Sequence, residues 1–167
     1  MSQMFFNEVE AAKIAQNMEK NGLDFYQRAA ARTANPAVRD VFLKLIDDEK
    51  SHLAAFEELE ETLQAHRADG AAYADDPEIG AYIGRLLQTQ VFCEKCTVTG
   101  MLDQARDDCS ALAVAMQAER DAILFYQEML DFVDSKEARN AFEWILKEER
   151  AHLRTIGERG AACGFTV

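Results

Sequence analysis

The stretch Glu49-Lys50-Ser51-His52 decides the fold, because it returns one hundred residues later as Glu149-Arg150-Ala151-His152. Aligned without a gap, residues 11–60 and 111–160 share twelve identities in fifty pairs. Internal duplication explains this agreement far better than chance does. The shared positions include two glutamates and one histidine in each half, so the repeat preserves chemistry as well as apolar spacing.

The composition fits one domain spanning residues 1–167, with 49% apolar residues and a formal net charge of -12. A field of that sign repels nucleic-acid phosphates and anionic membrane surfaces, so neither is expected as a partner. No apolar run reaches the length of a membrane span, and no basic segment precedes Glu8 as in a signal peptide. We therefore expect a cytoplasmic protein whose four cysteines are reduced thiols.

Apolar residues recur at helical spacing through most of the chain and predict two antiparallel hairpins, over residues 8–67 and 108–159. Asn7, Asn35 and Ser135 are the expected helix caps. The first helix is expected to end near Ala34, the second near Arg67, the third near Val133 and the fourth between Gly157 and Gly160. Residues 68–107 form a long crossover, with a short helix from Asp76-Pro77 and several glycines, including Gly100, as breaks. The predicted fold is an all-α four-helix bundle with one long connection.

Spacing also predicts where the repeated glutamates lie in the bundle. Glu19 stands 16 residues before the joint at Asn35, and Glu49 stands 14 residues after it. At about 1.5 Å per residue, both lie roughly 21–24 Å from the same end. The second hairpin repeats this relation around Ser135, and each histidine shares a helix face with the glutamate three residues before it. Six side chains should therefore converge: Glu19, Glu49, His52, Glu119, Glu149 and His152.

Metal ions best explain four carboxylates at one height in a bundle. The positions three and four residues away from these glutamates are mostly apolar and include no lysine or arginine. Unpaired buried carboxylates are costly and repel one another, whereas two divalent cations would neutralise all four. The alternative, surface glutamates in salt bridges, would put charge in the middle of each apolar stripe. Oxygen and imidazole ligands suit iron or manganese and tolerate zinc, and spacing does not choose among them.

The ligand set resembles that of the ferritin-like di-iron carboxylate proteins, and the pairs Phe25-Tyr26 and Phe125-Tyr126 point to the rubrerythrin group. The resemblance covers both hairpins and implies two iron ions per chain. It implies Glu49 and Glu149 as bridging ligands and Glu19 and Glu119 as terminal ligands, with His52 and His152 on one metal each. It also implies that Tyr26 and Tyr126 hydrogen-bond the ligands, although buried tyrosines with any other partner would give the same pattern.

In activity, the resemblance implies reduction of hydrogen peroxide, or of dioxygen, with electrons from a separate donor such as rubredoxin. It also implies a homodimer. Two departures bear on this activity: Ala122 stands where rubrerythrins carry a further glutamate, and with only one C-x-x-C pair in the sequence we expect no rubredoxin domain after the bundle. A ferroxidase that handles iron and a non-catalytic di-metal redox sensor therefore remain as alternatives.

Three features outside the ligand set have more than one interpretation. The pair in Cys93-Glu94-Lys95-Cys96 fits a redox pair, half of an intermolecular metal site or ordinary reduced thiols. Trp144 is expected to pack in the bundle or at a subunit contact. His66 is expected to be exposed to solvent.

Overall fold

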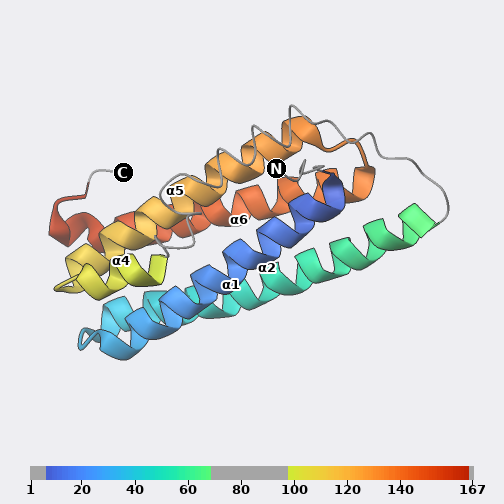
Figure 1. The fold of residues 1–167 in the computed structure, drawn as a ribbon. Helices are drawn as coiled ribbons and strands as arrows, with labels where there is room; N and C mark the ends of the chain where they lie inside the picture. Colours follow the sequence, from blue (N-terminus) through green and yellow to red (C-terminus); the bar gives the residue numbers. More distant parts are fainter. Residues whose placement is uncertain (1–6, 69–97, 166–167) are drawn as a thin grey trace, which may run out of the picture.

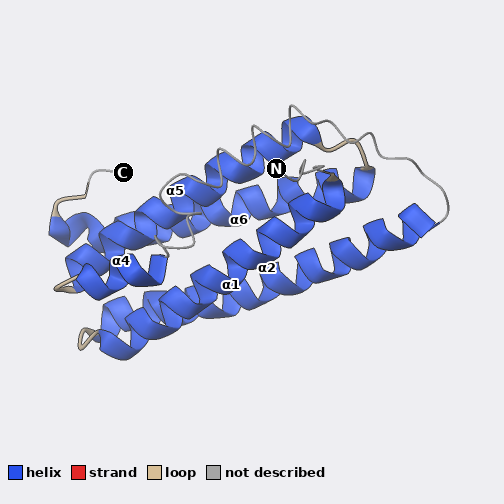
Figure 2. Cartoon of the chain, viewed as in Figure 1, coloured by secondary structure: helices blue, strands red, loops and turns tan. Residues whose placement is uncertain are grey.

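The computed structural model describes residues 7–68 and 98–165, and these residues are almost entirely helical (Figure 1). The long helices are α1 (Glu8–Arg32), α2 (Pro36–Ala68), α5 (Asp108–Phe132) and α6 (Lys136–Gly160). A short helix α4 (Val98–Gln104) precedes α5, and a 3-10 turn η1 (Ala161–Cys163) follows α6. The described residues contain no strand (Figure 2). The predicted all-α, ferritin-like four-helix bundle is confirmed.

The helix ends follow the capping residues in the sequence. The Asn7 side chain accepts a hydrogen bond from the Glu10 amide at 3.1 Å, and the Asn35 side chain accepts one from the Ala37 amide at 3.0 Å. Ser135 accepts a hydrogen bond from the Ala138 amide at 3.2 Å. These side chains satisfy amides that have no partner within the helix, which fixes where each helix begins.

The two hairpin turns lie at opposite ends of the bundle (Figure 1). Arg32, at the end of α1, donates to the Leu102 carbonyl of α4 at 2.9 Å. At the other end of α1, the Glu8 carboxylate accepts hydrogen bonds from the amides of Asp134 and Ser135 at 2.6 and 2.9 Å. Because each end of α1 is tied to the second half of the chain, the repeated glutamates of the two hairpins meet in the middle.

The apolar core divides into two clusters, one on either side of that middle layer along the helices. In one cluster, the rings of Tyr26 and Phe42 stack with their centroids 6.0 Å apart. In the other, the rings of Tyr126 and Phe56 stack with their centroids 5.7 Å apart. Both tyrosines are almost fully buried, so each hairpin contributes one tyrosine next to the polar layer.

The structure describes only part of the predicted crossover over residues 68–107. The helix expected from Asp76-Pro77 lies outside the described residues. Helix α4 was not predicted from the sequence. The expectation that Gly100 interrupts helical structure is wrong, because Gly100 lies inside α4. Packing outweighs the low helix propensity of glycine here, since Leu102 is fully buried and its carbonyl is held by Arg32.

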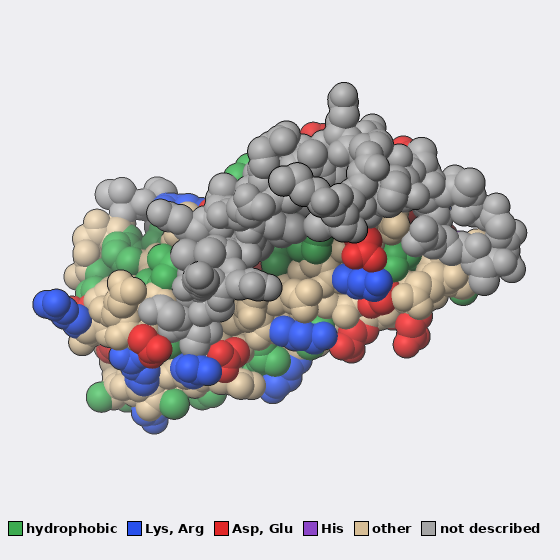
Figure 3. All heavy atoms as spheres, in the orientation of Figure 1, with side chains coloured by type: hydrophobic (Ala, Val, Ile, Leu, Met, Phe, Trp, Pro, Cys, Tyr) green, Lys and Arg blue, Asp and Glu red, His purple; other side chains and the backbone are tan. Residues whose placement is uncertain are grey.

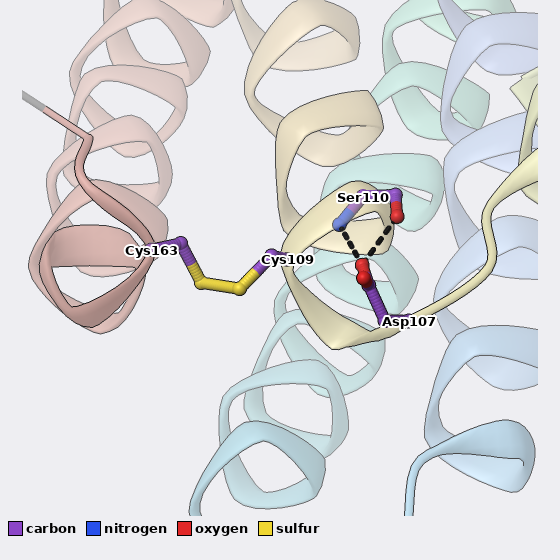
Figure 4. Close-up of a disulfide and its surroundings, with 4 residues drawn as sticks. All are labelled: Asp107, Cys109, Ser110 and Cys163. Carbon is purple, nitrogen blue, oxygen red and sulfur yellow. Dashed lines mark hydrogen bonds between the residues drawn. A yellow bond between two sulfur atoms is a disulfide. The ribbon is translucent and has the colours of Figure 1, made fainter.

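The expectation that all four cysteines are reduced is wrong for one pair. Cys109, in the first turn of α5, forms a disulfide with Cys163, in η1 (Figure 4). The sequence shows only that 54 residues separate them. Their contact depends on α6 returning the chain to the end of the bundle where α5 begins. Cys93 and Cys96 lie outside the described residues.

Charged side chains of both signs are interspersed on the described part of the face in Figure 3. Pairs one helical turn apart account for some of this mixing, such as Lys50 with Asp47 at 3.0 Å and Arg28 with Asp24 at 3.0 Å. None of the helices in the described residues has the length and apolar character needed to cross a membrane.

Candidate metal centre

The bundle brings together all six side chains that the repeat singled out. Each long helix contributes: α1 gives one glutamate, α5 gives one, and α2 and α6 each give a glutamate and a histidine. All six are buried, with exposed fractions between 1% and 4%: Glu19, Glu49, His52, Glu119, Glu149 and His152. His66 lies on the surface as expected.

The two histidines turn their Nδ1 atoms toward carboxylates. His52 Nδ1 lies 3.3 Å from Glu19 Oε2 and 3.3 Å from Glu149 Oε1. His152 Nδ1 lies 3.3 Å from Glu149 Oε2, 3.6 Å from Glu119 Oε1 and 3.8 Å from Glu49 Oε1. Possible ligand atoms of Glu49, His52, Glu149 and His152 all lie within 4.8 Å of one another. Glu149 reaches both histidines, one with each carboxylate oxygen.

This donor set fits a pair of metal ions. The Nδ1 atoms of both histidines and the Nε2 atom of His152 are buried without a hydrogen-bond partner. Buried polar atoms without partners are uncommon, and imidazole nitrogens that face carboxylates are well placed to bind a cation. Oxygen and imidazole donors with no thiolate suit iron and manganese.

Without metal, the cluster holds protons instead. Burial raises the pKa of Glu49 well above its usual range, with Glu19 adding repulsion, and burial beside Glu149 raises the pKa of Glu119 to about 8. The carboxylates outweigh burial at the histidines and raise the pKa of His52 to about 9 and that of His152 to about 11. Metal binding must therefore release protons from this site.

The two tyrosines connect the hairpins across this layer. The Tyr26 hydroxyl of the first hairpin donates to Glu119 Oε1 of the second, and the Tyr126 hydroxyl donates to Glu19 Oε1 of the first. Burial and the nearby carboxylates raise the pKa of both phenols, so both remain protonated donors. Each hydrogen bond orients a carboxylate that faces a histidine.

Sequence reasoning missed one contact of this centre. Asp48 belongs to the acidic run Asp47-Asp48-Glu49 of α2, and such a run is typical of a solvated helix face. Instead, Asp48 Oδ2 lies 3.3 Å from Nε2 of His152, and the Asp48 side chain is 31% exposed. Lys44 Nζ lies 3.9 Å from the same carboxylate oxygen. No pattern within α2 signals this contact, because His152 comes from the other hairpin.

A small cavity of about 50 Å³ lies beside the glutamates, lined mainly by α1 and α5. Gly22 and Ala122, which occupy equivalent places in the repeat, both line it. A Cβ atom on Gly22 would lie 3.2 Å from Glu49 Oε2, so this glycine gives the carboxylate room. The remaining lining residues are Met18, Glu19, Asn21, Tyr26, Ala118, Glu119, Tyr126 and Glu149.

Comparison with known proteins agrees with this arrangement. The family model for Rubrerythrin matches residues 4–60, which include Glu19, Glu49 and His52. Over these residues the chain is similar to rubrerythrin. The second half of the chain, which the family model does not cover, repeats the three matched ligand positions at Glu119, Glu149 and His152. A buried Glu and His cluster that can hold metal is thus shown.

Two solved structures have a similar fold. A DUF305 fragment from Deinococcus radiodurans has a TM-score of 0.64 at 16% identity, covering 93% of this chain and 95% of that one. A hypothetical protein from Methanococcus jannaschii has a TM-score of 0.66 at 16% identity, covering 100% of this chain and 87% of that one. No curated protein matches the chain in sequence. At 16% identity, these two structures support the fold alone.

Proposed function

We propose that this rubrerythrin-like chain is a di-iron oxidoreductase that reduces hydrogen peroxide with electrons from a separate donor protein. The observation that carries the proposal is the buried layer of four glutamates and two histidines, in which three of the four imidazole nitrogens are buried without a hydrogen-bond partner. Such a layer costs free energy unless protons or cations neutralise it. Two divalent cations would neutralise the negative charges of all four carboxylates.

Each residue of the layer has a role in this proposal. Glu19 and His52 would hold one iron, and Glu119 and His152 the other, with Glu49 and Glu149 shared between them. The iron pair, when bound, would supply two electrons, which together with two protons reduce one hydrogen peroxide to two waters. Tyr26 and Tyr126 keep the carboxylates of Glu119 and Glu19 oriented by their hydroxyl hydrogen bonds.

The cavity between α1 and α5 supports a small oxidant as the substrate. Its volume of about 50 Å³ has room for a few water-sized molecules and is far below the several hundred Å³ of pockets for organic ligands. Hydrogen peroxide and dioxygen both fit that size. Glu19, Glu119 and Glu149 line the cavity, so a molecule bound there would meet the ligand carboxylates directly.

The remaining parts of the proposal concern partners. Rubredoxin, or a donor protein of similar chemistry, would return electrons to the site, and two chains would assemble as a homodimer. Light scattering of the purified chain measures the second point directly. Ala122 lines the cavity where rubrerythrins carry a further glutamate, so this chain would run the reaction without that carboxylate.

The decisive experiment is anaerobic loading with Fe(II), followed by optical titration with hydrogen peroxide and, separately, with dioxygen. We expect two irons per chain, rapid oxidation with one peroxide consumed per two irons, and much slower oxidation by dioxygen. The double variant Glu49→Gln with Glu149→Gln is the matched control, because it removes two carboxylate charges with little change in side-chain size. It should bind less iron and lose the rapid phase.

Other results would replace the proposal. Fast reaction with dioxygen and continued uptake of iron beyond two per chain would identify a ferroxidase. Loaded metal that peroxide leaves unchanged would indicate a non-catalytic di-metal sensor. Failure of the wild-type chain to bind two metals would contradict the centre itself.

A further inference from the structure

Trp144, the single tryptophan of the chain, occupies an unusual place on α6. Its side chain is 39% exposed, yet its ring packs against His52 of α2 in a T-shaped arrangement. The ring centroids are 5.4 Å apart and the planes cross at 89°. From the sequence, this residue is expected to pack in the bundle or at a subunit contact. The structure places it between solvent and a candidate iron ligand.

The ring contact continues beyond His52. The imidazole rings of His52 and His152 stack at 5.1 Å with an interplanar angle of 24°. Three neighbouring rings, with successive centroids 5.4 and 5.1 Å apart, therefore lead from the surface to both histidines of the centre. In the described part of the chain, Trp144 is the only large aromatic side chain that is exposed.

The equivalent position in the first hairpin offers no such route. Lys44 stands there, and its ammonium lies 3.9 Å from Asp48. The cavity that suits the oxidant lies elsewhere, between α1 and α5, whereas Trp144 and His52 belong to α6 and α2. The centre is thus approached by a cavity on one side and by an exposed ring on another.

We propose that Trp144 is the electron entry point of the centre, through which a reduced one-electron iron–sulfur donor protein passes electrons to His52. The inference rests on the proposed redox function and adds the route by which the donor acts. Two donor molecules each lose one electron, and two Fe(III) ions become two Fe(II). No bond of Trp144 forms or breaks. The indole fills the space between the donor and the imidazole, and the electron is transferred across it.

The test separates re-reduction from oxidation. The oxidised di-iron protein is mixed anaerobically with excess reduced rubredoxin, and the return of rubredoxin colour is followed by stopped flow. Trp144→Leu should slow this phase several-fold while iron content and the rate of oxidation by peroxide stay at wild-type values. Trp144→Phe keeps an aromatic ring next to His52 and should recover most of the rate. Leu124→Ala, at another exposed apolar site, should change nothing.

A second readout does not depend on turnover. Because Trp144 is the sole tryptophan and touches His52, binding of Co(II) to the metal-free chain should quench its fluorescence in step with metal uptake. Equal re-reduction rates for wild type and Trp144→Leu, or slowing by Trp144→Phe as large as by Trp144→Leu, would overturn the entry role. If peroxide fails to oxidise the iron but Trp144→Leu still slows re-reduction, the peroxidase proposal fails and the entry role stands. Absence of bound iron in the wild type would overturn both.

Discussion

The two hairpins present the same three ligands in the same order, but the two histidines face different neighbours. Behind His152 stands the Asp48 carboxylate, 3.3 Å from Nε2. Next to His52 stands the Trp144 ring, with centroids 5.4 Å apart. The repeat therefore preserves the charges that hold metal and changes the groups that surround them. One side of the centre is polar and the other is aromatic.

The hairpins also differ at the positions equivalent to the disulfide. Val9 and Leu63 of the first hairpin are buried apolar residues of one core cluster. Their counterparts one hundred residues later are Cys109 and Cys163, which are covalently joined. The first hairpin is held there by packing and the second by a bond. Each such pair of positions gives a variant and its matched control within one chain.

Loss of a histidine ligand is the largest expected change and tests whether the two halves are equivalent as metal sites. We expect His52→Ala and His152→Ala each to reduce bound metal from two ions to one per chain. Affinity at the lost site should fall by more than the roughly 10- to 100-fold that loss of an outer partner costs. Equilibrium dialysis with metal analysis measures both values. Two tightly bound metals in both variants would contradict the assignment of one histidine to each ion.

The pH dependence of the metal-free protein is the next largest effect. Folding raises the pKa of His52 from 6.5 to about 9 and that of Glu119 from 4.5 to about 8. A raised pKa means that the folded state binds the proton more tightly, so this stability is present at low pH and is lost as pH rises through the folded value. We expect Tm of the metal-free chain to fall between about pH 4.5 and 9, with the contribution of His52 lost above about pH 6.5.

Metal should remove that dependence, because the ions replace the protons. The difference in Tm between loaded and metal-free chains should therefore grow with pH over the same range. His66→Ala is the control, since His66 is exposed and lies outside the cluster. A metal-free Tm that rises from pH 6.5 to 9 would show that the folded chain binds fewer protons than the unfolded chain, with its buried histidines neutral, and would contradict this prediction.

Much of the centre was predictable from the sequence because its determinants are local. The helical period puts Glu49 and His52 on one face, and a short joint fixes the height of Glu19 opposite them. The repeat then supplies the second half. The roles of Asp48 and Trp144 were not predictable in this way, because each depends on which side chain of the other hairpin packs against it. The disulfide has the same cause, since it depends on where α6 ends relative to α5.

The disulfide gives a test of the second difference between the hairpins. Cys109→Ser should destabilise the chain by about 2–4 kcal/mol, as expected for a loop of this length in the unfolded state. The disulfide closes a loop whose ends lie 54 residues apart in the sequence, and the loop contains nearly all of α5 and the whole of α6. Chemical unfolding with and without reductant measures the change, and reductant should have no further effect on the variant. Unchanged stability on reduction of the wild type would show that packing alone holds this end.

The smallest effect should come from the carboxylate behind His152. Asp48→Asn removes the charge that faces His152 Nε2, so the imidazole binds metal less strongly, and we expect roughly a 10-fold loss of affinity at one site. Glu148→Gln is the matched control at the equivalent position of α6, because the His52 ring is packed by Trp144 and its described carboxylate contacts are Glu19 and Glu149. Competition with a metal-binding dye measures both sites. Equal losses in the two variants would mean that both histidines have carboxylate partners in solution, and the contrast between a polar and an aromatic side of the centre would not hold.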